Sequence, residues 1–285
     1  MSARLALVGV GLIGGSYALA LKQAGKLGSV VGCGRSRANL DWALAHGVID
    51  AIADSPSQTV RGADIVMLAV PVGQVESVLA EIAAHIPPHA LVTDAASTKQ
   101  NVVAAARAHL GTHLPRFVPG HPIAGTEHSG AAAARADLYQ GRRVVLTPLP
   151  ETEAAALHEV RALWQACGAR VAEMEAAEHD AVFAAVSHLP HLLSYAYMDM
   201  IAARADSTRC LDYAASGFRD FTRIAASSPE MWRDIALANR AALLSEFARF
   251  EEHWRALRDA LEKGDGTALE TIFARARNTR KDWSL

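Results

Sequence analysis

The chain begins with a short apolar run that passes directly into a glycine-rich loop. Residues 5–8 are all apolar, and the sequence GVGLIG follows from Gly9 to Gly14. A continuous apolar run of this kind is typical of a strand buried on both faces of a parallel sheet. A helical stretch then extends to about Ala24, and Gly25 suits the C-cap position. The order of strand, glycine loop and helix predicts the first unit of an open α/β sheet that binds a dinucleotide.

Each glycine of this loop has its own expected role. Gly9 permits the tight turn, Gly11 lets a pyrophosphate approach the backbone, and Gly14 allows the helix to pack closely on the strand. The free N–H groups and the dipole of the helix N-terminus would hold the phosphates. The alternative is a purely structural turn. The predicted cofactor-binding residues here are Gly9, Gly11, Leu12, Ile13 and Gly14, with Val70 and Pro71 after a later strand.

The end of the second predicted strand, residues 29–33, bears on the choice of cofactor. NAD-binding chains carry an acidic residue about 20 residues past the glycine loop, where it accepts hydrogen bonds from the ribose. This chain instead has Gly34, followed by Arg35, Ser36 and Arg37. Two guanidinium groups and a hydroxyl suit a 2′-phosphate. We therefore predict that NADP is preferred over NAD; the alternative is that the arginines only cap the next helix.

Further strand-like segments alternate with Ala-rich helical stretches up to about residue 175. The strand-like segments are 64–70, 90–94, 117–118, 143–147 and an edge strand at 170–174; the helical ones are 72–84, 99–110 and 153–167. This alternation predicts a Rossmann-type, doubly wound and mostly parallel sheet in residues 1–175. The strand pattern stops after Glu175, so an all-helical domain is expected in residues 176–285.

Composition excludes several classes of partner. The 285 residues carry a net charge of −2, and 51% are hydrophobic, as in globular domains. No basic stripe is present, so nucleic acid is not an expected partner. The three cysteines are scattered, which argues against a disulfide framework and a metal site. The apolar run 65–74 is too short to span a bilayer, and the N-terminal sequence leaves no room for a signal peptide; both favour a cytoplasmic protein.

Two polar residues follow predicted strands, where ligands bind in open α/β sheets. His121 lies between Gly120 and Pro122 on a rigid turn, which suits proton transfer, although a structural turn histidine would fit the same pattern. Ser97 follows the strand at 90–94 and could cap the next helix, donate a hydrogen bond to a substrate hydroxyl, or do both.

The helical half carries several imidazole and guanidinium groups. Residues 179–204 are apolar on nearly every side and should be buried within a helical domain or an interface, with a kink at Pro190. His188 and His191 share one helix face, as do Arg219 and Arg223 further along the chain.

Two more helices are expected after these groups. Ser228 and Pro229 are typical first residues of a helix, which would carry Trp232. Apolar residues then recur at helical spacing from Leu243 to Leu261, and the helix should stop near Gly264. This stripe fits an intrachain core and a dimer interface equally well.

The motifs together resemble one enzyme family. Five of them occur in a fixed order: GVGLIGGS, DAASTK, GHPIAGTEHSG, SHLPH and GFRDFTRIAASSPEMW. In order and spacing they are similar to the prephenate/arogenate dehydrogenase family of tyrosine biosynthesis, from Leu5 to about Ala260. The resemblance implies a nucleotide-binding domain, a helical domain that forms a homodimer, and oxidative decarboxylation of a cyclohexadienol with NAD(P)⁺. Prephenate and arogenate both fit these motifs.

The resemblance also implies roles for individual residues. His121 matches the catalytic histidine, which accepts the proton of the ring hydroxyl, and Ser97 matches the serine that hydrogen-bonds this hydroxyl. Arg223 matches the arginine that pairs with a substrate carboxylate. The other implied pocket residues are His188, His191, Glu127, Gly217, Arg219, Asp220 and Trp232. Gly34 departs from the aspartate of NAD-dependent members.

Two classes of protein remain as alternatives. A β-hydroxyacid dehydrogenase or imine reductase would share the glycine loop and a helical second domain. Those enzymes normally place a catalytic lysine or another group on the helix between the domains, where this chain has SHLPH. A non-catalytic dinucleotide-sensing regulator would need the glycine loop, but not His121, Ser97 and Arg223 together.

Overall fold

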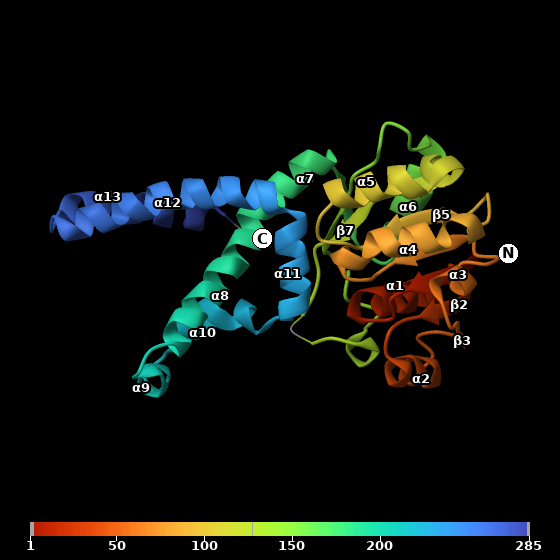
Figure 1. Ribbon diagram of the computed structural model, residues 1–285, viewed down its shortest axis with the longest axis horizontal. Helices are drawn as coiled ribbons and strands as arrows, with labels where there is room; N and C mark the ends of the chain where they lie inside the picture. Colours follow the sequence, from red (N-terminus) through yellow and green to blue (C-terminus); the bar gives the residue numbers. More distant parts are fainter. Residues whose placement is uncertain (1–2, 127, 284–285) are drawn as a thin grey trace. The chain divides into compact units, whose positions relative to one another are not determined.

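The computed structural model describes residues 3–126 and 128–283 (Figure 1). The chain divides into two compact units, residues 1–239 and residues 240–285. Each unit has its own arrangement of helices, and the first contains all the strands of the described residues.

A six-stranded parallel sheet forms the centre of the first unit, in the order β3-β2-β1-β4-β5-β6. Its strands are β1 (Ala3–Val8), β2 (Leu27–Cys33), β3 (Ala51–Ile52), β4 (Ile65–Leu68), β5 (Leu91–Asp94) and β6 (Phe117–Val118). This is the strand order of a doubly wound dinucleotide-binding fold, and the predicted fold class is confirmed.

Helices cover both faces of this sheet because successive strand residues point to opposite sides. On β1, Leu5 and Leu7 face one core, whereas Ala6 and Val8 face the other. The first core is covered by α1 (Leu12–Gln23), α2 (Arg37–Ala45) and α6 (Ala154–Ala166), the second by α3 (Pro56–Thr59), α4 (Val75–Ile82) and α5 (Gln100–His109).

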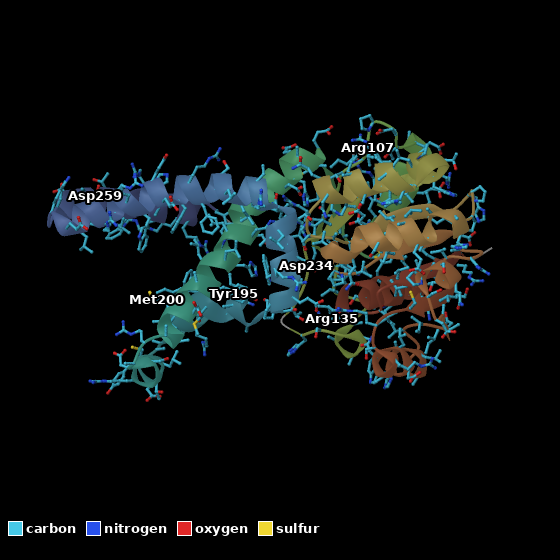
Figure 2. All side chains as sticks on the ribbon, viewed as in Figure 1. Arg107, Arg135, Tyr195, Met200, Asp234 and Asp259 are labelled. Atoms are coloured by element: carbon cyan, nitrogen blue, oxygen red, sulfur yellow. The ribbon has the colours of Figure 1, made fainter. Side chains whose placement is uncertain are left out.

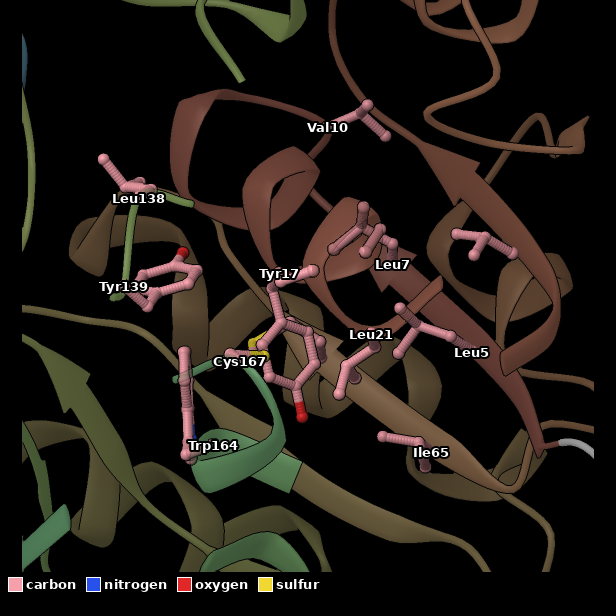
Figure 3. Packing of buried hydrophobic residues seen from close by; sticks show 14 of the residues in the cluster. Leu5, Leu7, Val10, Tyr17, Leu21, Ile65, Leu138, Tyr139, Trp164 and Cys167 are labelled. Atoms are coloured by element: carbon pink, nitrogen blue, oxygen red, sulfur yellow. The ribbon is translucent and has the colours of Figure 1, made fainter. Parts of the chain in front are cut away.

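Aromatic side chains fill the first core between α1 and α6. The rings of Tyr17 and Trp164 have centroids 4.5 Å apart, and Tyr139 packs edge-on against Trp164 at 5.1 Å (Figure 3). Such pairs contribute about 0.5–1.5 kcal/mol each beyond the area that they bury. The core therefore fixes α1, and with it the glycine loop at the N-terminus of α1.

The strand segments 143–147 and 170–174 were predicted as parts of a single sheet, whereas the structure has a second, three-stranded sheet. It consists of β7 (Gly120–Pro122), β8 (Arg143–Leu146) and β9 (Arg170–Glu173), with β7 antiparallel to β8 and β8 parallel to β9. Pro119 lacks an N–H donor and lies between β6 and β7, where the chain passes from one sheet to the other. His121 therefore lies within a strand of the small sheet, and not on a turn after β6.

The rest of the first unit is helical. It contains α7 (Ala176–Phe183), a π-helical turn (Ala184–His188), α8 (Leu189–Ala202), α9 (Ser207–Asp212), α10 (Ser216–Thr222) and α11 (Pro229–Ala238). Pro190 lies in the first turn of α8, and the π-helical turn directly before it interrupts the predicted long helix.

Residues 179–204, predicted to be buried within the helical domain or an interface, are only partly buried in a single chain. Val186 is 65% exposed and Met200 is 51% exposed. Tyr195 and Met200 both extend from α8 in Figure 2, and the Tyr195 hydroxyl donates a hydrogen bond to the Ser227 carbonyl at 2.6 Å. One side of α8 is thus held by the 223–227 segment, and burial of the exposed side chains in an interface stays a prediction.

The second unit is a pair of helices, α12 (Arg240–Glu262) and α13 (Gly266–Asp282), which contact each other. Gly264 has a φ of +64°, and α12 ends two residues before it, as predicted. Trp254 and Leu261 of the apolar stripe are 57% and 68% exposed. In the described part of the chain, no helix combines the length and apolarity needed to cross a membrane.

Candidate active site

The backbone of Gly120, directly before His121, is held by a buried ion pair. Lys99 is fully buried; its ammonium group donates to the Asp94 carboxylate and, at 2.6 Å, to the Gly120 carbonyl. The Asp94 carboxylate accepts the Gly120 N–H at 3.1 Å. Because Asp94 ends β5 and Gly120 begins β7, this pair joins the two sheets at the position of the histidine.

The ring of His121 is the first member of a hydrogen-bonded chain. Its Nδ1 atom lies 2.9 Å from Nε2 of His179, and Nδ1 of His179 lies 2.9 Å from the Asp180 carboxylate. An ionised carboxylate only accepts, so Nδ1 of His179 carries a proton and its Nε2 accepts the proton on Nδ1 of His121. Nε2 of His121 is then the unprotonated nitrogen, which is the form required of a general base.

Asp180 also caps a helix from a distant part of the sequence. Its carboxylate accepts the N–H groups of Lys99 at 2.7 Å and Gln100 at 2.9 Å, at the N-terminus of α5. The expectation that Ser97 caps this helix is therefore wrong, since α5 begins at Gln100 and Asp180 supplies the acceptor. Ser97 is half-buried in the loop after β5.

Burial keeps the site's histidines neutral. The pKa of His121 lies well below its usual value of 6.5, first because burial penalises the charged ring and then because of the charges of His179 and Lys99. Burial also lowers the pKa of His179, against the opposing effect of Asp180. Burial lowers the pKa of Lys99 as well, and Asp94 opposes this change.

A second cluster surrounds His188 and His191. Nδ1 of His188 accepts from the Asn239 side chain at 3.0 Å, so its Nε2 carries the proton. The backbone of Ser97 lies near this buried N–H, but no well-formed hydrogen bond to it is present within residues 3–126 and 128–283. Burial lowers the pKa of His188 to about 4, an effect opposed by Asp180 and by the backbone of Ser97. A buried donor without a well-formed hydrogen bond is available to a ligand.

His191 stacks on the predicted aromatic residue. The ring centroids of His191 and Trp232 are 3.7 Å apart with an interplanar angle of 20°, and Nδ1 of His191 donates to the Ser187 carbonyl at 2.8 Å. Burial lowers the pKa of His191, and the charge of Arg223 lowers it further. Arg223 thus lies near this cluster, where its exposed guanidinium could meet an anionic ligand.

Three other predicted pocket residues lie on α10, which packs against α8. Gly217, Arg219 and Asp220 are exposed on α10, where Arg219 and Asp220 form a loose ion pair at 3.9 Å. That these three residues line the substrate pocket stays a prediction. Glu127 lies outside the described residues.

The glycine loop fits a bound pyrophosphate. A Cβ atom at Gly9 would lie 2.4 Å from the Ala69 carbonyl, and one at Gly14 would lie 2.4 Å from the Gly9 carbonyl, so both positions require glycine. At Gly11, no atom of the described residues lies within 4 Å of an added Cβ. The N-cap residue of α1 is Gly11, and no side chain of the described residues accepts a hydrogen bond from this helix end. The first N–H groups of α1 are therefore available to phosphate oxygens.

The other predicted cofactor residues lie next to the glycine loop. Leu12 is buried and Ile13 is half-buried in the first turn of α1. The Val70 nitrogen would lie 3.1 Å from a Cβ at Gly9, and Pro71 follows it. Ser36 caps α2 by accepting the Asn39 N–H at 3.3 Å, so the arginines do not cap this helix.

Both arginines after β2 already have acidic partners. Arg37 pairs with Asp41 at 2.9 Å within α2. Arg35 pairs with Glu230 of α11, also at 2.9 Å. The two guanidinium groups are more than half exposed, so both remain accessible to an incoming phosphate.

Several residues of the site were not predicted. Asp94 and Lys99 stand at the two ends of the DAASTK motif, but only Ser97 was selected from it. His179, Asp180 and Asn239 were missed entirely. A polar His–Asp pair at the start of an apolar helix was the one signal that the sequence offered.

Comparisons with known proteins place these sites in context. The family described as "Prephenate dehydrogenase, nucleotide-binding domain" matches residues 17–173, and the family described as "Prephenate dehydrogenase, dimerization domain" matches residues 175–275. The cyclohexadienyl dehydrogenase of Zymomonas mobilis is 36% identical, over 97% of this chain and 94% of its own length. The prephenate dehydrogenase of Bacillus subtilis is 37% identical, over 98% of this chain and 76% of its own length.

A solved structure is also similar over the whole fold. The crystal structure of prephenate dehydrogenase from A. aeolicus, in complex with hydroxyphenyl propionate and NAD⁺, has a TM-score of 0.91 to this chain. The two are 34% identical, and the match covers 99% of this chain and 98% of that one.

Proposed function

This chain belongs to the prephenate dehydrogenase family of nicotinamide-dependent oxidoreductases, and we propose that it converts prephenate to 4-hydroxyphenylpyruvate and CO₂ in tyrosine biosynthesis. The observation that carries the proposal is the chain of hydrogen bonds from Asp180 through His179 to His121. It leaves Nε2 of His121 unprotonated, as removal of a hydroxyl proton requires.

The reaction needs a base, a hydride acceptor and a leaving carboxylate. A nicotinamide dinucleotide held at the glycine loop would supply the acceptor for the hydride on the ring carbon that bears the hydroxyl group. Nε2 of His121 accepts the hydroxyl proton. The bond to the ring carboxylate breaks, CO₂ leaves, and the bonding electrons enter the ring, which becomes aromatic as a phenolate. His121 then returns the proton to the ring oxygen, so that the product is the phenol and the base is neutral again. The positive charge formed on His121 is stabilised through His179 by the Asp180 carboxylate.

The remaining polar groups position the substrate in this proposal. Ser97 orients the ring hydroxyl, and the free Nε2–H of His188 donates to a substrate oxygen. Arg223 pairs with a substrate carboxylate beside His191 and Trp232. Gly217, Arg219, Asp220 and Glu127 stay proposed members of the pocket, on the strength of the motif resemblance alone.

We propose NADP as the preferred cofactor. Gly34 supplies no carboxylate to bind the ribose or repel a 2′-phosphate, and Arg35, Ser36 and Arg37 follow it. The glycine loop residues Gly9, Gly11, Leu12, Ile13 and Gly14, with Val70 and Pro71, would hold the rest of the molecule.

The proposal also covers assembly. The two family matches meet between residues 173 and 175, which supports a division into a nucleotide-binding domain (1–175) and a helical domain (176–285). The second match is described as a dimerization domain, which supports a homodimer. An alternative substrate is arogenate, alone or beside prephenate, because the Zymomonas mobilis relative is named for cyclohexadienyl substrates in general.

A steady-state assay tests the proposal. Reduced nicotinamide is followed by its absorbance for prephenate and arogenate, each with NAD⁺ and NADP⁺. We expect turnover of prephenate and a higher kcat/KM with NADP⁺. Turnover of arogenate alone would favour the alternative substrate, and binding of a dinucleotide without turnover of either compound would favour a sensing protein.

A further inference from the structure

The ion pair between Arg35 and Glu230 joins two distant parts of the first unit. Nη1 of Arg35 lies 2.9 Å from the Glu230 carboxylate, although 195 residues separate them in the sequence. Arg35 follows Gly34 at the end of β2, where a 2′-phosphate is bound in NADP-dependent chains of this fold. Glu230 lies in the first turn of α11.

The position of Glu230 is fixed by the packing of its helix. Trp232 and Ile235 of α11 are buried in the second core with Val72. On the same helix, Asp234 lies so close to Gly73 that a Cβ atom added there would be 2.7 Å from its carboxylate (Figure 2). The helix is thus seated against the turn that follows β4, which holds the Glu230 side chain at the cofactor side of the sheet.

A bound 2′-phosphate would need the Arg35 guanidinium, which already pairs with Glu230. A carboxylate and a phosphate both accept from the same fork of guanidinium N–H groups. The neighbouring Arg37 is paired within its own helix, so Arg35 is the cation whose partner comes from α11. Binding of NADP would break the Arg35–Glu230 pair or leave a carboxylate next to the phosphate, whereas NAD brings only a hydroxyl group.

We propose that Glu230 competes with the 2′-phosphate of NADP for Arg35 and so limits the preference for NADP over NAD. This inference rests on the proposed dinucleotide site. Glu230 acts as a specificity-determining residue from the helical segment. The pair is exposed, so its effect is moderate and should weaken as salt is added.

Direct binding measurements on the full-length protein test the inference. The Kd values for NADP⁺ and NAD⁺ are measured by titration calorimetry, at low and at high salt, for the wild type, Glu230→Gln and the control Glu159→Gln, which removes an exposed carboxylate on α6. In Glu230→Gln the Kd for NADP⁺ should fall by about fivefold at low salt, the upper range for an exposed ion pair. The Kd for NAD⁺ should stay within about twofold, and Glu159→Gln should change neither value by more.

A second pair of variants shows whether Arg35 mediates the effect. Adding Glu230→Gln to Arg35→Ala should leave the Kd for NADP⁺ unchanged, because the contested cation is already gone. An equal change for both cofactors, or the same gain in the Arg35→Ala background, would overturn the inference. Normal binding of NAD⁺ with no response of NADP⁺ would also overturn it and leave the proposed function intact. If the wild type bound neither cofactor, the proposed function would fail together with the inference.

Discussion

Nε2 of His179 lies 2.9 Å from Nδ1 of His121, and this contact determines which nitrogen of His121 carries a proton. The Asp180 carboxylate fixes the proton on the far side of His179, and the same carboxylate caps α5. The N-terminus of α5 and the base on β7 are therefore held by one residue. We expect the geometry of the base to depend on α7 as much as on its own strand.

Replacing His179 tests this dependence. His179→Ala should lower kcat by about tenfold or more, but by less than the 10²–10⁴ expected for loss of the base itself, with KM little changed. The reason is that His121 loses its orienting acceptor and the stabilisation of its charged form. Steady-state kinetics across pH measures the effect, with His158→Asn as a control because His158 is exposed. A normal kcat and an unchanged pH profile would show that His179 has only a packing role.

Much of the large sheet could be predicted because its strands are continuous apolar runs separated by turn residues. The small sheet could not, since β7 consists of Gly120, His121 and Pro122 and shows no apolar pattern. His121 was found because of its rigid sequence neighbours. Its partner His179 is 58 residues away, and no local pattern reports a contact over that separation.

Local sequence also does not show which acidic group pairs with a given cation. The Gly34–Arg37 segment predicts a phosphate site when it is read by itself, but the partner of Arg35 is 195 residues away. A cap of α5 by Ser97 was one of two roles considered because a nearby hydroxyl is the usual cap, whereas the acceptor comes from α7. The family resemblance carried by the motifs is confirmed by matches to residues 17–173 and 175–275.

Placing an acid at Gly34 should reverse the cofactor preference. A Cβ atom at this position would lie 3.7 Å from the Leu40 side chain and 3.8 Å from the Val10 nitrogen, which are ordinary contact distances. The carboxylate of Gly34→Asp would repel a 2′-phosphate and accept from the ribose hydroxyls of NAD. The ratio of kcat/KM for NADP⁺ to that for NAD⁺ should fall by about tenfold or more. An equal or better rate with NAD⁺ in the unmodified protein would contradict the starting premise.

Assembly should bury the apolar side chains that a single chain leaves exposed. These include Val186, Met200, Tyr213, Trp254 and Leu261. We predict a dimer with an interface above ~2,000 Å², the range of obligate assemblies. Sedimentation equilibrium at the concentrations used for assays measures the mass. An active monomer under those conditions would refute the prediction.

His188 should make the folded protein less stable as the pH falls. Its pKa is about 4 in the folded chain because of burial, whereas the unfolded value is about 6.5. Between these values the unfolded state binds a proton that the folded state does not, so the free energy of unfolding decreases as the pH falls from about 6.5. This one group should account for a loss of about 2 kcal/mol between pH 7 and pH 5.

Urea unfolding at the two pH values, at one fixed protein concentration, checks this prediction. His188→Gln should lose less stability on acidification than the wild type. The exposed His158 serves as the matched control, because His158→Asn should leave the pH dependence as it is. The other buried histidines act in the same direction, so part of the dependence should remain in His188→Gln. An identical slope in that variant would contradict the assignment.

The last prediction separates chemistry from binding. His121→Asn should lower kcat by about 10² to 10⁴ with KM little changed, because it removes the base and leaves the pocket. Arg223→Ala should raise KM by about fivefold with kcat little changed, because its guanidinium is exposed and an exposed ion pair contributes up to about 1 kcal/mol. Steady-state kinetics on prephenate gives both values. His121→Asn should therefore change mainly kcat, whereas Arg223→Ala should change mainly KM.

The pH profile adds an independent test of the base. The rate of the wild type should rise with pH along one ionisation, since only neutral His121 accepts the proton. Burial and the neighbouring charges hold the pKa of His121 well below 6.5, so this limb should lie on the acidic side of that value. It should disappear in His121→Asn, whose residual rate depends on no such group. A near-normal kcat in His121→Asn, or the same pattern in both variants, would make His188 and His191 the next candidates for the base.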